Sequence, residues 1–221
     1  MLKIDIITLF PSMFKGPFDE SIVKRAQDKK LVEINIHDLR EYGFGERRTV
    51  DDRPYGGGIG MILMVEPIYK VLKRVKTKDS RVILLTPRGK TFNQENALKL
   101  SQSKHLIFIA GHYEGYDERI TEFVDEEISI GNFILTGGEI PTMIIVDSIV
   151  RLIPKVLEKE DATKFESFSE ENKLEYPQYT RPEEFKGLKV PKVLLSGNHK
   201  EISDWREQKS KEKTIKINSE N

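Results

Sequence analysis

Short apolar segments alternate with segments of helical spacing along most of the chain. The strand-like segments are Lys3–Thr8, Val32–His37, Arg81–Leu85, His105–Ala110 and Glu127–Ser129. The helix-like segments are Asp19–Lys29, Glu66–Lys76, Asn93–Leu100 and Glu139–Ile153. Strands that alternate with helices predict an α/β fold with a mainly parallel sheet and helices on its faces.

The segment Glu139–Ile153 is apolar on nearly every side, and Pro154 follows it directly. Within it, Asp147 and Arg151 lie four residues apart, which is the spacing of an ordinary helical ion pair. Because the rest of the segment is so apolar, both residues are also candidates for a functional edge of the helix. The spacing by itself leaves these two interpretations open.

Two glycine-rich loops follow predicted strands. Residues 110–119 read Ala-Gly-His-Tyr-Glu-Gly-Tyr-Asp-Glu-Arg, and residues 129–139 read Ser-Ile-Gly-Asn-Phe-Ile-Leu-Thr-Gly-Gly-Glu. Glycine permits positive φ and a close approach of the backbone to a ligand. One interpretation is that both loops are only tight turns. Their mixture of glycine with aromatic and charged residues favours a cofactor held by main chain at the carboxyl edge of the sheet.

The segment Arg40–Gly60 is long, polar and rich in glycine, which is typical of a functional loop. Its cluster Tyr55-Gly-Gly-Gly-Ile-Gly60 lacks the final glycine and the preceding strand of a dinucleotide-binding fingerprint. A nicotinamide-dependent oxidoreductase is therefore disfavoured. Arg47, Arg48 and Arg53 are available for phosphates, and the alternative interpretation of these charges is a solvated surface.

The character of the chain changes after the long apolar segment. Residues 155–179 are polar and acid-rich, with no helical or strand period. Helix starts are expected at Pro182–Phe185 and at Asn198. We therefore expect a cofactor-binding α/β domain at 1–154, a linker at 155–180 that is ordered by ligand binding, and a small helical domain at 181–221.

Composition narrows the classes of function. The chain has 221 residues with 36 basic and 36 acidic side chains, so its zero net charge argues against generic nucleic-acid binding but permits a local basic patch. There is no cysteine for disulfides or thiolate chemistry, and the four histidines show no metal-ligand spacing, so no zinc site is expected. No apolar run is long enough for a membrane span, and we expect a cytoplasmic location.

Several separated motifs resemble, in the correct order, those of the bacterial tRNA (guanine-N1)-methyltransferases, the TrmD family. They are Arg48–Gly58, Ala110–Arg119, Ser129–Gly131, Leu135–Glu139, Tyr179–Pro182 and Val193–His199. The resemblance runs from about Ile6 to Trp205. It implies an S-adenosylmethionine-dependent methyltransferase of the SPOUT class, with a deep trefoil knot in the cofactor region. The implied reaction is methylation of N1 of the guanosine directly 3′ of the tRNA anticodon, at position 37.

The resemblance implies three cofactor-binding loops. Their residues are Leu84, Leu85, Thr86, Pro87 and Gly89 in the first, Gly111, Tyr113, Glu114 and Gly115 in the second, and Ile130, Gly131, Phe133, Leu135, Gly137 and Gly138 in the third. Two positions depart from many relatives, because Asn132 and Phe133 stand where Asp and Tyr are common. Backbone contacts to adenine should survive this change, whereas a contact from a tyrosine hydroxyl would not.

The catalytic residues implied by the resemblance are Arg151 and Glu166. The family usually has Asp at the second position, so Glu166 keeps the carboxylate and adds a methylene. Asp161 and Glu170 are nearby acidic alternatives that fit the surrounding pattern less well. The change also leaves open a catalytically impaired relative that binds tRNA only. The expected substrate-binding residues are Arg53, Gly57, Gly58 and Ser167.

The resemblance also implies two partners, tRNA and a second copy of the chain, because family members are homodimers whose active site is shared between subunits. Basic residues of the loop that holds Arg53 and of the C-terminal segment, among them Arg206 and Lys209, are expected to contact the tRNA. The activity of the family is linked to Mg²⁺, for which the sequence assigns no ligands.

Overall fold

The structure is a computed structural model that describes residues 1–159, 163–170 and 173–220. The chain divides into two compact units, Met1–Glu158 and Lys159–Asn221. From the sequence, the first domain is expected to end at 154 and to be followed by a linker at 155–180. Most of that linker belongs to the second unit.

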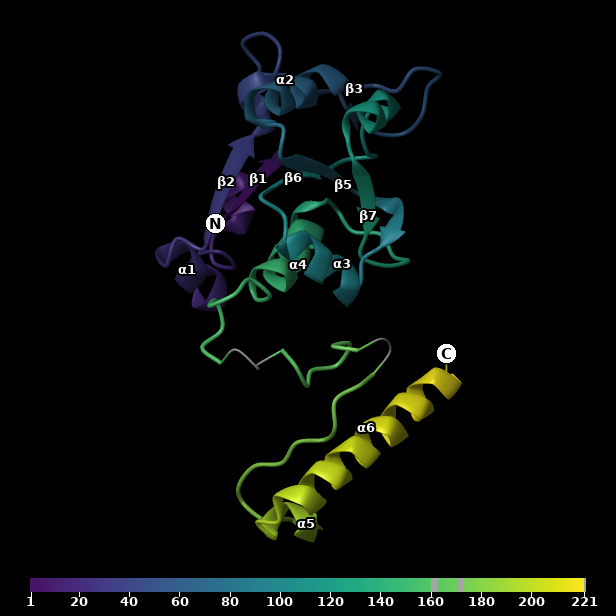
Figure 1. Ribbon diagram of the computed structural model, residues 1–221. Helices are drawn as coiled ribbons and strands as arrows, with labels where there is room; N and C mark the ends of the chain where they lie inside the picture. Colours follow the sequence, from purple (N-terminus) through teal and green to yellow (C-terminus); the bar gives the residue numbers. More distant parts are fainter. Residues whose placement is uncertain (160–162, 171–172, 221) are drawn as a thin grey trace. The chain divides into compact units, whose positions relative to one another are not determined.

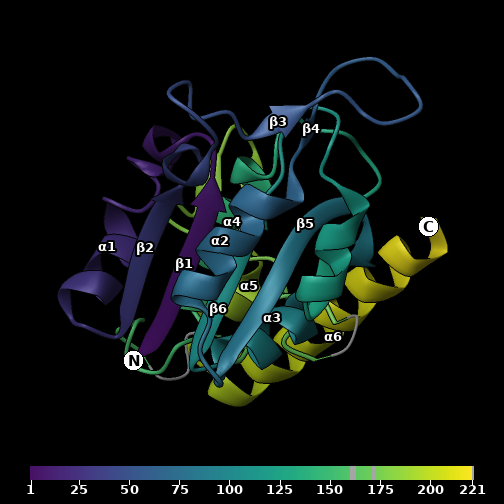
Figure 2. The ribbon, with the colours of Figure 1, turned by 90° about the horizontal axis from the view of Figure 1, so that it is seen from above.

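A five-stranded sheet forms the centre of the first unit (Figure 2). Its strands are β1 (Leu2–Thr8), β2 (Val32–Asp38), β5 (Ser80–Thr91), β6 (His105–Ala110) and β7 (Glu126–Ser129). Their spatial order is β2-β1-β6-β5-β7, and every neighbouring pair is parallel. The predicted α/β class with a mainly parallel sheet is confirmed.

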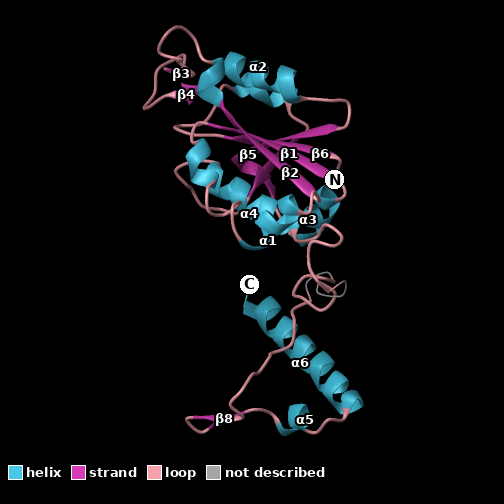
Figure 3. Ribbon diagram, turned by 90° about the vertical axis from the view of Figure 1, so that its left-hand side faces the viewer, coloured by secondary structure: helices cyan, strands magenta, loops and turns pink. Residues whose placement is uncertain are grey.

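Helices cover both faces of this sheet, as Figure 3 shows. One face carries α2 (Val65–Val75), and the other carries α1 (Ser21–Asp28), α3 (Gln94–Ser101) and α4 (Glu139–Val150). Each face has its own apolar core. In β6, Phe108 points to the core with α4 and Ile109 to the core with α2, which is the alternation that a strand imposes.

Two elements of the first unit differ from the sequence prediction. The strand predicted at Arg81–Leu85 continues to Thr91, because an irregularity between Leu85 and Lys90 lets the chain bulge out and then rejoin β7. The helix predicted to end at Ile153 ends earlier, so Arg151 is the residue that caps the C-terminus of α4.

The remaining elements of the first unit are short. They are the 3-10 helices Pro11–Phe14, Leu39–Tyr42 and Glu118–Phe123, and the antiparallel pair β3 (Asp51–Asp52) and β4 (Ile62–Leu63). The segment Arg40–Gly60 thus begins in a 3-10 helix and contains β3, and its glycine cluster lies with Arg53 in the loop between β3 and β4. Residues 53–61 are called the arginine and glycine loop below.

The second unit contains β8 (Glu184–Phe185), β9 (Leu188–Lys189), α5 (Lys192–Leu195) and the long C-terminal helix α6 (His199–Glu220) (Figure 1). The helix start expected at Asn198 is correct, whereas the one expected at Pro182–Phe185 is wrong. Lys186 and Gly187 both have positive φ, at 52° and 82°, and this pair makes the tight turn of a β-hairpin.

Burial in the second unit is slight. Among residues 159–216 that the structure describes, Ser210 is the one buried side chain. No helix in the described part of the chain is both long and apolar enough to cross a membrane.

Candidate cofactor pocket and catalytic residues

A cavity of about 590 Å³ lies in the first unit, where the loops that follow β6 and β7 meet the bulge of β5. These three strands are parallel neighbours, so their carboxyl ends reach the same edge of the sheet. The bulge brings Thr86, Pro87 and Arg88 to one side of the cavity. This is the edge at which open parallel sheets bind their ligands.

Backbone contacts hold two of these loops together. The N–H of Gly138 donates to the carbonyl of Gly111 at 2.7 Å, and His112 forms a bridge with Gly137. A Cβ at position 138 would lie 2.8 Å from the Cα of Ala110, which is closer than packed atoms allow. The glycine is therefore required by this crossing of two backbone segments and not by its φ, which is −83°.

Most of the cofactor-binding residues expected from the resemblance line this cavity. They are Leu85, Thr86, Pro87, Gly111, Tyr113, Glu114, Gly115, Ile130, Gly131, Phe133, Leu135, Gly137 and Gly138. Leu84 does not line it, because that side chain is fully buried in the core beneath α2. Gly89 does not line it either, since it packs against the backbone of Glu127 and Ile128. The structure brings this set together, and its role with a cofactor stays a prediction.

Arg88 is a lining residue that the sequence analysis did not single out. Its guanidinium donates to the hydroxyl of Tyr116 at 3.4 Å and to the carboxylate of Glu118 at 2.9 Å. These two hydrogen bonds raise the pKa of Arg88. The sequence does contain a signal for Arg88, because it lies between a proline and a glycine, and such residues mark the place where a strand turns into a loop.

A buried polar cluster lies beside the same loops. The hydroxyl of Thr8 donates to the carboxylate of Glu139 at 2.8 Å, and this carboxylate is 1% exposed. Nδ1 of His112 lies 3.5 Å from the same carboxylate and has no hydrogen-bond partner among the described residues. Glu139 is the first residue of α4, where the helix dipole favours a negative charge.

The arginine and glycine loop is attached to the cavity by backbone hydrogen bonds. The N–H of Glu114 donates to the carbonyl of Met61, and the N–H of Leu63 donates to the carbonyl of Gly115. A Cβ at Gly60 would lie 2.5 Å from Cγ of Glu114. The expected substrate-binding residues Arg53, Gly57 and Gly58 are exposed in this loop.

The two expected catalytic residues belong to different units. Arg151 caps α4 in the first unit, and Glu166 lines a cavity of about 200 Å³ in the second unit together with Arg206. Their pairing stays a prediction. Ser167, expected to bind substrate, accepts a hydrogen bond from the N–H of Glu175 at 3.1 Å.

Two other carboxylates, Asp161 and Glu170, are the alternatives to Glu166 as the catalytic base. Asp161 lies outside the described residues. Glu170 forms an ion pair with Lys173 at 3.1 Å. Across the described ranges of the chain, no three His, Cys, Asp or Glu side chains are grouped as a metal ion would need.

Comparison with known proteins places this geometry in a family. The model of the family "tRNA (Guanine-1)-methyltransferase TrmD" matches residues 2–220. A tRNA (guanine-N(1)-)-methyltransferase from Dictyoglomus turgidum is 56% identical over 215 residues, which cover 97% of this chain and 87% of the relative. The proteins of the same name from Carboxydothermus hydrogenoformans and Staphylococcus carnosus are 54% and 53% identical, and the matches cover 95% and 94% of this chain and 83% and 85% of those proteins. The chain therefore belongs to the TrmD family of tRNA (guanine-1)-methyltransferases.

Proposed function

We propose that this protein transfers a methyl group from S-adenosylmethionine to N1 of the guanosine at position 37 of tRNA, directly 3′ of the anticodon. The observation that carries the proposal is the cavity at the carboxyl edge of the sheet, built from the three loops expected to hold the cofactor, in a chain that belongs to this family.

The residues of the cavity fit a bulky nucleoside cofactor. A volume of about 590 Å³ lies within the range of small-molecule sites. Glycines at 111, 131, 137 and 138 line it, so backbone N–H and C=O groups can reach the edge of an adenine, while Ile130 and Leu135 offer apolar contact to its faces. At Gly137, a Cβ would lie 2.4 Å from Nδ1 of His112, so a larger residue would close this cradle.

The chemistry needs a base and a charge-stabilising group. S-adenosylmethionine supplies an activated methyl group when bound. Guanine N1 carries a proton at neutral pH, and the carboxylate of Glu166 removes it as the base is methylated. Negative charge then grows toward guanine O6, and the planar guanidinium of Arg151 stabilises that charge and orients the base. The target base must leave its stack to reach these groups.

We also propose a homodimer in which each active site uses both subunits. Ile140 and Ile144 of α4 are 44% and 45% exposed, and Phe133 and Ile134 of the adjoining loop are 53% and 79% exposed. Apolar side chains gathered on one helix and its preceding loop support an interface with a second copy. The separation of Arg151 and Glu166 into two units of the chain is compatible with this sharing.

The finer features of the fold are part of the same proposal. We infer that the cofactor region is a trefoil knot, and the close crossing of Gly138 over Ala110 and Gly111 supports a chain that passes tightly through itself there. We assign the activity to the cytoplasm, where tRNA is modified. For Mg²⁺ we assign no ligands on this chain.

One alternative rests on a specific residue. Glu166 stands where the family usually has Asp, so a relative that binds tRNA without methylating it is the second candidate function. Both candidates require tRNA binding, and only the enzyme transfers the methyl group.

The deciding experiment is a methyl-transfer assay on a tRNA transcript with G at position 37, followed by identification of the modified nucleoside. The proposal predicts N1-methylguanosine at position 37. A transcript with A37 is the matched control and should accept no methyl group. Binding of both transcripts with no methylation would favour the alternative.

A further inference from the structure

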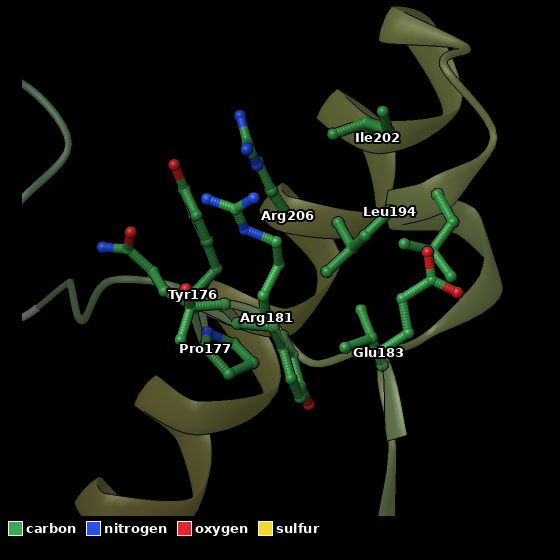
Figure 4. A pocket seen from close by; sticks show the side chains of 12 residues that line it. Tyr176, Pro177, Arg181, Glu183, Leu194, Ile202 and Arg206 are labelled. Carbon is green, nitrogen blue, oxygen red and sulfur yellow. The ribbon is translucent and has the colours of Figure 1, made fainter. Parts of the chain in front are cut away.

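The second unit contains a cavity of about 380 Å³ that the proposed reaction does not use (Figure 4). One wall is apolar and comes from Val190, Leu194 and Ile202. Another wall is aromatic, from Tyr176 and Tyr179. A cavity lined by both aromatic and aliphatic side chains is suited to a planar ring, and the volume is of the order needed to enclose one such group.

Two guanidinium groups border this cavity. The Cζ of Arg206 lies 4.8 Å from the centroid of the Tyr176 ring, so a cation–π contact orients this guanidinium while its N–H groups remain able to donate. Figure 4 shows Arg181 extending toward the same side of the view as Arg206. Neither arginine forms an ion pair with any residue that the structure describes. The pair is suited to an anion such as phosphate.

We propose that this cavity holds one unstacked nucleotide of the tRNA strand, with its base against Tyr176 and the aliphatic wall and its phosphate at Arg181 and Arg206. Glu183 also lines the cavity and can accept a hydrogen bond from an amino group of the base. This inference rests on the proposed function, since it requires that tRNA is the substrate.

A strand suits the site better than a free nucleotide. Tyr179 and Leu195 are 49% and 50% exposed, so the cavity is open enough for a chain to enter and leave. Residues 185–221 carry nine Lys or Arg against five Asp or Glu, which provides the local positive charge that follows a phosphate backbone.

The site also borders the surroundings of the proposed catalytic base. Tyr176, Ile202 and Arg206 line both this cavity and the one that Glu166 lines. A nucleotide bound against Tyr176 and Arg206 therefore contacts side chains that also enclose Glu166.

The test measures equilibrium binding of a tRNA transcript to the full chain at several salt concentrations. Arg206→Lys keeps the charge but loses the planar stack, and Tyr176→Leu removes the aromatic face. Tyr176→Phe keeps that face, and Lys99→Ala removes an exposed charge of α3 in the first unit that lines neither cavity. Circular dichroism of each variant checks that α6 is intact.

We expect Arg206→Lys and Tyr176→Leu each to weaken tRNA binding by about tenfold. Tyr176→Phe and Lys99→Ala should bind within about twofold of the parent, and Arg206→Lys should keep the parent salt slope because its charge is retained. Affinity for S-adenosylmethionine should not change. If Arg206→Lys and Tyr176→Leu bind as tightly as Lys99→Ala, the nucleotide site is wrong while the proposed function stands. A parent chain that binds no tRNA would overturn both.

Discussion

The two units of this chain differ in how much of their side-chain surface is buried. In residues 1–158, apolar side chains from strands and helices form two continuous cores, one on each face of the sheet. In the described part of residues 159–216, Ser210 is the one buried side chain, and it donates to the carbonyl of Leu174. A unit of this size with so little buried surface is expected to gain order from what it binds.

The comparison suggests a division of labour. The first unit carries the proposed cofactor cavity on a scaffold that its own core stabilises. The second unit carries Glu166 and the proposed nucleotide site on a surface that RNA or a second subunit can complete. Apart from Arg151 and the arginine and glycine loop, substitutions in the first unit should therefore act mainly on stability and cofactor affinity. Substitutions in the second unit should act mainly on RNA binding and turnover.

The largest effect is expected on the rate of methyl transfer, when Glu166 of the second unit is replaced. Glu166→Gln keeps the size of the side chain but cannot accept the proton, so methyl transfer should fall by about 10² or more. Affinities for S-adenosylmethionine and tRNA should change little, because the loss is confined to the transition state. Single-turnover kinetics and separate binding titrations measure these quantities.

Glu166→Asp is the matched control, since it restores the residue usual in the family and shortens the side chain by one methylene. If the segment around it can adjust, activity should stay within about tenfold of the parent. Near-parent turnover of Glu166→Gln would mean that another carboxylate, Asp161 or Glu170, is the base.

The next effect is expected in the first unit, at the backbone crossing beside the cavity. Gly138→Ala places a Cβ 2.8 Å from the Cα of Ala110 and from the backbone nitrogen of Gly111, and neither atom can move freely. We expect a loss of about 2–3 kcal/mol in the free energy of unfolding, measured by urea denaturation.

Gly111→Ala is the matched control for that crossing. Its Cβ would meet Tyr116 at 3.6 Å, an ordinary contact, so stability should change by less than about 1 kcal/mol. Equal stability of the two variants would show that the crossing is not tightly packed.

A smaller effect concerns a charge buried in the sheet. Asp5 is 1% exposed and accepts hydrogen bonds from His37 at 2.7 Å and from His105 at 2.5 Å, with Lys3 at 3.1 Å. Burial is the strongest single influence and raises its pKa, but these bonds together outweigh it and lower the pKa of Asp5 from 3.8 to about 2. A lowered carboxyl pKa stabilises the fold above the unfolded value and loses that stability as the pH falls from 3.8 toward 2.

Asp5→Asn should therefore cost about 2 kcal/mol of unfolding free energy at pH 7 and flatten the pH dependence of stability in that acid range. The exposed Asp19→Asn serves as the control and should leave the pH profile as it is. If Asp5→Asn leaves the pH dependence of the unfolding free energy unchanged in this acid range, Asp5 is not the source of that dependence.

The sequence predicts best those elements whose residues are buried, because burial leaves an apolar pattern in the sequence. The strand His105–Ala110 has the predicted bounds because all six residues are buried and the five after His105 form one apolar run. The extension of β5 escapes prediction because Pro87 and Gly89 look like a turn, and the chain rejoins the sheet only through tertiary pairing with β7. The β8–β9 hairpin escapes it because its four strand residues are all exposed and leave no apolar pattern.

The candidate site divides in the same way. Glycine spacing and the family resemblance locate the three loops of the cavity, since glycines mark where backbones approach each other. The contact of Arg88 with Glu118 and the position of His112 beside Glu139 depend on how distant loops meet, which no local pattern encodes. The proposed partnership of Arg151 and Glu166 is a matter of how units and subunits are placed, which no local pattern encodes.

The most direct test of the account is a mixed dimer of Arg151→Ala and Glu166→Gln subunits, isolated with two different affinity tags and assayed for methyl transfer to tRNA. Each variant alone should be nearly inactive. If Arg151 of one subunit works with Glu166 of the other, the mixed dimer has one intact site of two and should recover about half of the parent activity. If the mixed dimer is as inactive as the two single variants, the active site is not shared in this way and the central claim is wrong.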